Sequence, residues 1–125
     1  MGREKNDAAR RGEQAAALFL RRKRYEILGS NVRTPFGELD LVARHDGVMV
    51  FVETKTRTGD SLGPPSISVT WRKARSVVKN ALFYLKSRGI PETPWRIDVV
   101  SVRLGPCLEV EHIELIENAV ENNGY

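Results

Sequence analysis

The chain has 125 residues, with 20 basic and 16 acidic side chains and a formal net charge of +4, which is the size of a single globular domain. Its content of 41% hydrophobic and 29% charged residues excludes wholesale disorder, and its uncharged runs are far shorter than the roughly 20 residues that cross a bilayer. Cys107 cannot form an internal disulfide and has only His45 and His112 as companions for a zinc site, so any metal must be held by oxygen. We therefore expect one cytoplasmic domain over residues 1–125, without a membrane span.

The first predicted element is a helix over residues 7–24, preceded by a short tail over residues 1–6. Helical spacing places Glu13 on a stripe that is otherwise made of alanine and leucine, so its carboxylate needs a partner there. Small alanines could also let Glu13 reach solvent or an arginine one turn away. The basic side chains of this segment could line a nucleic-acid backbone, and they are Arg10, Arg11, Arg21, Arg22, Lys23 and Arg24.

A strand over residues 25–33 is expected next, followed by a hairpin whose strands cover residues 38–45 and 48–57. The Asp46-Gly47 dipeptide between the two runs is typical of a two-residue type I′ turn. If His45 pairs with Val48, the numbers of paired residues sum to 93. This register places Asp40 opposite Glu53, and Glu38 opposite Lys55.

Alternation along the hairpin separates an apolar face from a mixed one. The apolar face is formed by Leu39, Leu41, Ala43, Val50 and Val52. The mixed face is apolar near the turn and charged at its far end, so we expect a helix over the first part and a cleft rim at the second. Its residues are Val42, Met49 and Phe51, then Glu38, Asp40, Glu53 and Lys55.

The remaining segments complete an α/β pattern. Residues 58–66 read as a mobile loop, and Trp71 to Leu85 follow helical spacing up to Gly89. A buried strand over 96–103 and a weaker strand over 108–116 come next, with room for a short C-terminal helix. The order α-β-β-β-α-β predicts a mixed central sheet flanked by helices, because a crossover helix joins parallel strands.

Two carboxylates that face each other across strands are roughly 5 Å apart and repel by about 3 kcal/mol at an effective dielectric near 20. One carboxyl could stay protonated, Lys55 and Arg57 could neutralise the pair, or a divalent cation could lie between them. A metal uses the most features, since Asp40 and Glu53 converge and Glu38 or Glu13 could add an oxygen. Mg²⁺ or Mn²⁺ held in this way, with Lys55 nearby, suits phosphodiester hydrolysis.

Charge is unevenly distributed along the chain. Residues 1–96 carry 19 basic and 10 acidic side chains, a net charge of +9, whereas residues 97–125 carry one basic and six acidic side chains, a net charge of −5. The basic part suggests a polyanionic partner, although an ordinary solvated surface would give the same count. Arg57 continues the charged face of the hairpin, and Lys73 could approach a phosphate or simply face solvent.

The segments GEQAA (12–16), GELDLVA (37–43), FVETKTR (51–57), SVTWRKAR (68–75), RIDVVSV (96–102) and HIELIENAV (112–120) resemble the YraN family of small endonuclease-like proteins. That family is similar to the PD-(D/E)xK nucleases, which have a restriction-endonuclease-like core, and to archaeal Holliday-junction resolvases. The resemblance implies Asp40 as the motif aspartate, Glu53 and Lys55 as the Glu-x-Lys pair, and Glu13 as the helix glutamate.

These observations lead to one expected function and one alternative. The expected function is a metal-dependent endonuclease for DNA, with branched DNA and a homodimer suggested by the resolvase resemblance. Its residues are Asp40, Glu53 and Lys55 for catalysis, with Asp40, Glu53 and Glu13 as metal ligands and Glu38, Arg57 and Lys73 as accessory residues. The alternative is a non-catalytic nucleic-acid-binding module of the same fold that acts in DNA repair or recombination.

Overall fold

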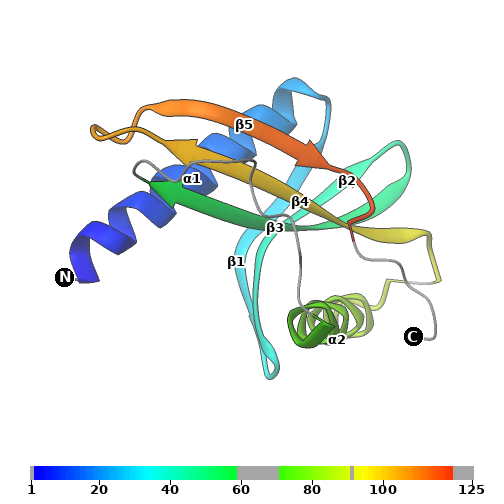
Figure 1. The fold of residues 1–125 in the computed structure, drawn as a ribbon. Helices are drawn as coiled ribbons and strands as arrows, with labels where there is room; N and C mark the ends of the chain where they lie inside the picture. Colours follow the sequence, from blue (N-terminus) through cyan, green and yellow to red (C-terminus); the bar gives the residue numbers. More distant parts are fainter. Residues whose placement is uncertain (1, 59–70, 91, 120–125) are drawn as a thin grey trace.

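The computed structural model describes residues 2–58, 71–90 and 92–119 (Figure 1). Apart from Thr58, the last residue of a strand, the predicted loop 58–66 lies outside these ranges, and so does the end of the chain where a C-terminal helix was expected. The elements are α1 (Gly2–Arg22), β1 (Glu26–Thr34), β2 (Gly37–His45), β3 (Val48–Thr58), α2 (Trp71–Ser87), β4 (Trp95–Leu104) and β5 (Val110–Ile116).

The five strands form one mixed sheet in the order β1-β2-β3-β4-β5. The pair β3 and β4, which α2 connects, is parallel, and the other three pairs are antiparallel. The predicted α/β class and the α-β-β-β-α-β order, with a fifth strand, are therefore confirmed, as expected for a restriction-endonuclease-like core. Within the described ranges, neither helix combines the length and apolar character needed to span a membrane.

The two helices pack on opposite faces of the sheet, as Figure 1 shows. One core lies under α1, where Ala16 and Leu20 meet strand residues such as Val52 and Val100. The other lies under α2, and its members are Leu39, Val42, Met49, Phe51, Val77, Val78, Ala81, Tyr84 and Ile97. The predicted helix over the apolar part of the mixed hairpin face is therefore α2.

α1 begins at Gly2, earlier than the predicted start at residue 7, so residues 2–6 are helical rather than a tail. It ends near the predicted place, where Arg24 has a left-handed φ of 71° and the amide of Tyr25 donates to the Leu20 carbonyl at 3.0 Å. Gly12 lies directly against Thr56 of β3, because a Cβ at position 12 would overlap the Thr56 side chain. This close approach fixes the distance between α1 and the sheet.

The hairpin between β2 and β3 has the predicted turn and register. Asp46 and Gly47 have φ values of 51° and 79°, as a type I′ turn requires. The paired residues run from His45 with Val48 to Leu41 with Val52, and every pair sums to 93.

The pairing of β2 with β3 stops at Leu41 and Val52, so the expected pairs of Asp40 with Glu53 and of Glu38 with Lys55 do not continue this ladder. Beyond this point β2 stays with β1 as far as Gly37, while β3 stays with β4 as far as Thr58. The two central strands thus diverge at Asp40.

The predicted face of Leu39 is wrong. Leu39 packs in the core under α2, whereas Leu41 packs under α1, so the simple alternation of β2 is broken between them. The change of face coincides with two irregularities: Asn31 of β1, between the residues that pair with Leu41 and Leu39, has a left-handed φ of 50°, and β2 separates from β3 beyond Leu41.

Candidate carboxylate site

Asp40 lies where β2 leaves β3, and its side chain occupies the start of the divergence. Its Oδ2 accepts a hydrogen bond of 2.8 Å from the backbone amide of Thr54. A side-chain carboxylate thus takes the amide donor of β3 just past the last paired residue of β2. The strand divergence and the placement of Asp40 are parts of the same local structure.

Glu13 of α1 comes close to this carboxylate from the face of the sheet that α1 covers. Its pKa is raised above the ordinary value of 4.5, first by burial and then by the negative charges of Asp40 and Glu38, while a hydrogen bond from Asn31 acts in the opposite direction. Because Glu13 feels both acids of β2, the fold brings these three acidic side chains into one region. The predicted stripe of α1, with Glu13 among alanines, faces the sheet.

Asn31 links two of these acids, and sequence reasoning missed it. With its amide nitrogen facing the carboxylates, that nitrogen lies 3.2 Å from Glu13 Oε1 and 3.1 Å from Glu38 Oε1. This orientation is required because the reverse one would place the amide oxygen against two carboxylate oxygens. The left-handed backbone that turns the side chain here is one that asparagine adopts more readily than most residues. Asparagine within a strand pattern is the one sequence signal for it.

Glu53, Lys55 and Arg57 lie along the part of β3 that has left β2. Glu53 is buried, with 5% of its surface exposed, while Lys55 and Arg57 are half-buried and all three interact with neighbouring groups. The uninterrupted pairing with β4 keeps β3 regular, so these three side chains share the face of Phe51, and Thr56 faces α1. Glu13 and the Glu-x-Lys pair therefore approach the divergence from opposite sides of the sheet.

The donor set fits a divalent cation held in part by phosphate and water. In the described ranges, no group of three or more His, Cys, Asp or Glu side chains forms a protein cage for a metal ion. Mg²⁺ ordinarily uses one or two carboxylates together with phosphate oxygens and several waters. Asp40 and one neighbouring acid would supply these one or two carboxylates. In the described residues, Asp40, Glu53 and Glu13 do not form a ready three-carboxylate site.

The basic residues expected near a nucleic acid are distributed around α1 and its end. Five of them are exposed, namely Arg10, Arg21, Arg22, Lys23 and Arg24, whereas Arg11 is half-buried. Lys73 belongs to α2, but its side chain lies outside the described part of the structure.

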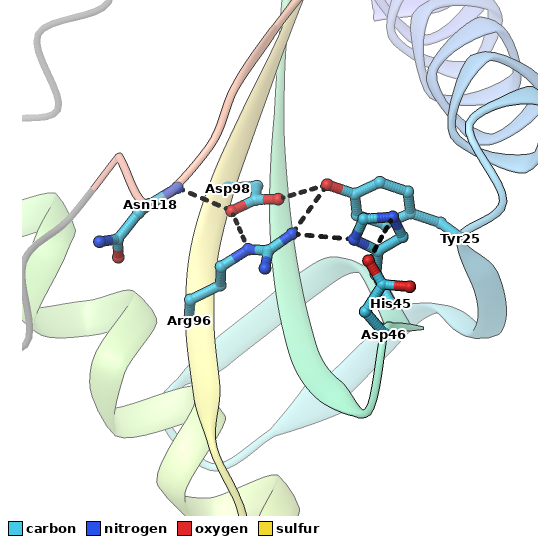
Figure 2. Close-up of polar contacts among 6 residues, drawn as sticks. All are labelled: Tyr25, His45, Asp46, Arg96, Asp98 and Asn118. Atoms are coloured by element: carbon cyan, nitrogen blue, oxygen red, sulfur yellow. Dashed lines mark hydrogen bonds and ion pairs between the residues drawn. The ribbon is translucent and has the colours of Figure 1, made fainter.

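A second charged cluster lies under the end of α1 and was not predicted (Figure 2). Asp98 of β4 is fully buried and accepts three hydrogen bonds, from the Tyr25 hydroxyl at 3.0 Å, from Arg96 Nε at 3.0 Å and from the Asn118 amide at 2.8 Å. Arg96 also donates to the Tyr25 hydroxyl at 2.9 Å. The ring of His45 stacks on that of Tyr25 with centroids 4.1 Å apart.

This cluster joins the end of α1, the β2–β3 turn, β4 and the segment after β5. Burial, followed by the charge of Asp98, raises the pKa of Tyr25 to about 12, so its hydroxyl stays protonated and can donate. The sequence carried one signal for it, since Asp98 is the only acid in the otherwise apolar strand Ile97–Val102. A single acid in a buried strand requires partners.

Comparison with known proteins identifies the family. Residues 12–102 match the model of the uncharacterised protein family UPF0102. The chain belongs to UPF0102, the YraN family. A UPF0102 protein of Syntrophotalea carbinolica is 47% identical over 102 residues, which cover 81% of this chain and 83% of the relative. A UPF0102 protein of Symbiobacterium thermophilum is 46% identical over 108 residues, which cover 86% and 91% of the two chains.

The part of the chain that matches UPF0102 contains the acidic side chains of both charged clusters, whereas Asn118, whose amide donates to Asp98, follows it. It includes Glu13, Asp40 and Glu53 as well as Tyr25 and Asp98, whereas Arg10 precedes it. The family is described as uncharacterised, so membership supplies relatives but no activity. Any function must be inferred from the side chains themselves.

Proposed function

We propose that this protein is a divalent-metal-dependent nuclease that hydrolyses phosphodiester bonds in DNA. The observation that carries the proposal is the gathering of acids where β2 and β3 diverge, where Asn31 bridges Glu13 and Glu38, and burial followed by the charge of Asp40 raises the pKa of Glu13. Like charges that come close in a partly buried place lower stability unless a proton or a cation offsets them. In a protein that binds no cation here, replacing one of these acids would increase the stability of the fold.

Each residue has a distinct role in the proposed reaction. Asp40 and Glu53 would hold Mg²⁺ or Mn²⁺, with Glu13 as an accessory ligand and Glu38 and Arg57 at the margin. The cation, when bound, supplies Lewis acidity toward the phosphate and increases the acidity of a water. The Lys55 ammonium orients the attacking water and offsets negative charge on the phosphate. Water adds its oxygen to phosphorus, the P–O bond to the leaving sugar breaks, and that sugar oxygen takes up a proton.

The charge distribution supports a nucleic acid as the substrate. The exposed basic side chains lie on α1, which carries Glu13, or directly after it, and Arg10 and Arg21 line the same groove as Glu13. The likeness to resolvases adds branched DNA as the preferred substrate class and a homodimer as the working form, because such a substrate is two-fold symmetric. A cytoplasmic location fits this substrate.

The direct test is cleavage of duplex, flap and four-way-junction DNA in the presence of Mg²⁺ or Mn²⁺. Lys55→Ala and Glu53→Gln should each reduce the rate by at least about 100-fold, because a general acid–base group or an electrostatic contact of this kind contributes 10²–10⁴-fold. Asp40→Asn is a sharper variant, since its amide oxygen can still accept from Thr54 while the negative charge is gone. Its folding should persist and its cleavage should not.

The matched control is Glu26→Gln, which removes one acid from an exposed ion pair with Arg44 in β1 and β2. This variant should cleave at the wild-type rate. Equal rates in Lys55→Ala, Asp40→Asn and the control would contradict the assignment. Binding of DNA without cleavage, and without a shift of melting temperature on adding Mn²⁺, would favour the non-catalytic binding module.

A further inference from the structure

A polar groove lies between α1 and β1, next to the carboxylate site. It encloses about 430 Å³, and its polar lining comes from Arg10, Glu13, Gln14, Arg21, Ser30 and Asn31. Ala17, Ile27 and Leu41 provide an apolar floor. Two guanidinium groups and several uncharged hydrogen-bonding groups thus surround a small apolar surface, and Glu13 belongs both to the groove and to the carboxylate region.

The positions of the two arginines follow from helix geometry. Arg10, Gln14, Ala17 and Arg21 repeat at helical spacing, so they lie on one face of α1, and both arginines are exposed. Their Cα atoms are about 16 Å apart at 1.5 Å per residue. At the B-form rise of 3.4 Å per nucleotide, this Cα separation corresponds to about five nucleotides, and an extended single strand would cover it with fewer.

The lining favours a sugar-phosphate backbone over other anionic partners. Guanidinium groups bind phosphate in a bidentate manner, and the apolar floor can contact deoxyribose. Glu13 lies between the two arginines in the sequence, and its carboxylate would repel a phosphate placed beside it. The phosphates are therefore expected at the two arginines, one at each end of the groove. A strand that lies along it therefore passes Glu13 and leads to Asp40.

We propose that this groove binds the backbone of one nucleic-acid strand, with Arg10 and Arg21 contacting phosphates that flank the reactive position. The position of the cleaved bond in this description rests on the proposed nuclease function, whereas the binding itself does not. The groove thereby selects a strand backbone rather than a base sequence, because phosphate contacts position a nucleic acid without reading it.

The experiment measures the binding of a fluorescent single-stranded DNA by anisotropy in EDTA, where no metal-dependent cleavage occurs. Replacing both groove arginines, Arg10→Gln with Arg21→Gln, should weaken binding about tenfold or more, since a hydrogen bond to a charged group contributes about 1.5–3 kcal/mol. It should also reduce the slope of log affinity against log salt by about 1.4, at about 0.7 for each single-strand contact.

The matched control removes two exposed basic side chains at and just after the end of α2, Lys86→Gln with Arg88→Gln, which lie outside the groove, and it has the same net charge. It should keep the wild-type slope. Equal slopes for the two double variants would overturn the inference, even if the enzyme cleaves DNA. A loss confined to the groove variant would support it, even if no cleavage is ever seen. Equal affinity for a polyglutamate peptide of the same charge would also overturn it, because the groove would then accept any polyanion.

Discussion

The two charged clusters of this fold treat buried charge in opposite ways. Around Asp98 every strong charge has an opposite charge or a donor within hydrogen-bond distance, from Arg96, Tyr25 and the backbone of Asn118. At Glu13, burial and then the charge of Asp40 raise the pKa, the hydrogen bond from Asn31 lowers it, and the charge of Glu38 raises it further by a smaller amount. The charges of the first cluster are matched by partners inside the cluster, whereas Glu13 of the second lies beside two further acids, of which Glu38 forms an exposed ion pair with Arg33.

Under the proposed function, this difference separates a structural role for the Asp98 cluster from a catalytic role for the acids around Glu13. A buried charge that keeps all its partners lowers the stability of the fold little, whereas removing one partner lowers it strongly. A set of like charges costs stability while it is intact and releases that cost when one is removed. Variants of the two clusters should therefore change stability in opposite directions.

The largest change is expected from Asp98→Ala. It leaves the Arg96 guanidinium, with 20% of its side chain exposed, without its carboxylate, and it removes the acceptor of Tyr25 and Asn118. We expect a loss of about 3–5 kcal/mol in the free energy of unfolding, measured by urea denaturation. Asp98→Asn keeps the shape and one acceptor and should lose less. A loss below about 1 kcal/mol in Asp98→Ala would mean that the cluster is not the stabilising one.

A smaller loss is expected from Tyr25→Phe, which retains the ring stacked on His45 and deletes only the hydroxyl. The free energy of unfolding should fall by about 1–3 kcal/mol, because Asp98 and Arg96 each lose a buried partner. The pKa of Tyr25 is raised to about 12, so its contribution is complete below pH 10 and is lost as the pH rises through 12. The difference between variant and wild type should narrow over that range, and a constant difference would refute the assignment.

The smallest effect, of opposite sign, is expected from Glu13→Gln. At neutral pH the melting temperature should rise slightly, because the amide is uncharged beside Asp40 and Glu38. The gain should disappear as the pH falls through the raised pKa toward 4.5, where wild-type Glu13 is itself protonated. The Glu13→Gln variant should also be stabilised less by Mn²⁺ than the wild type is. Glu26→Gln, which removes an ion pair with Arg44, is the control and should show no gain.

Much of the fold could be predicted because local chemistry decides it. Asp46 and Gly47 determine a turn that only a few residues can form, and that turn fixes the register from His45 to Leu41. Gly89, with a left-handed φ of 62°, ends α2 as expected from its position after a helical pattern. Glu13 could be singled out because its neighbours on the helix are apolar.

The remaining features depend on contacts between distant segments. Leu39 and Leu41 pack on opposite faces of the sheet next to the left-handed Asn31, and no periodicity in either strand predicts this change of face. The ladder of β2 and β3 ends at Leu41 and Val52, while β2 stays with β1 and β3 stays with β4, and the hairpin sequence does not show where the two strands separate. The partners of Asp98 come from the end of α1 and from Asn118, so an acid in a buried strand predicts that partners exist without naming them.

Gly12, which has no side chain, determines how deeply the charged side chain of Glu13 lies against the sheet. Because α1 rests on Thr56 at Gly12, the next residue, Glu13, is held at a depth set by backbone contact rather than by its own length. Any larger residue at position 12 would lift the helix and withdraw the glutamate without altering a single ionisable group. Gly12 thereby contributes to the burial that raises the pKa of Glu13, so this part of the site depends on how closely the main chain of α1 approaches the sheet.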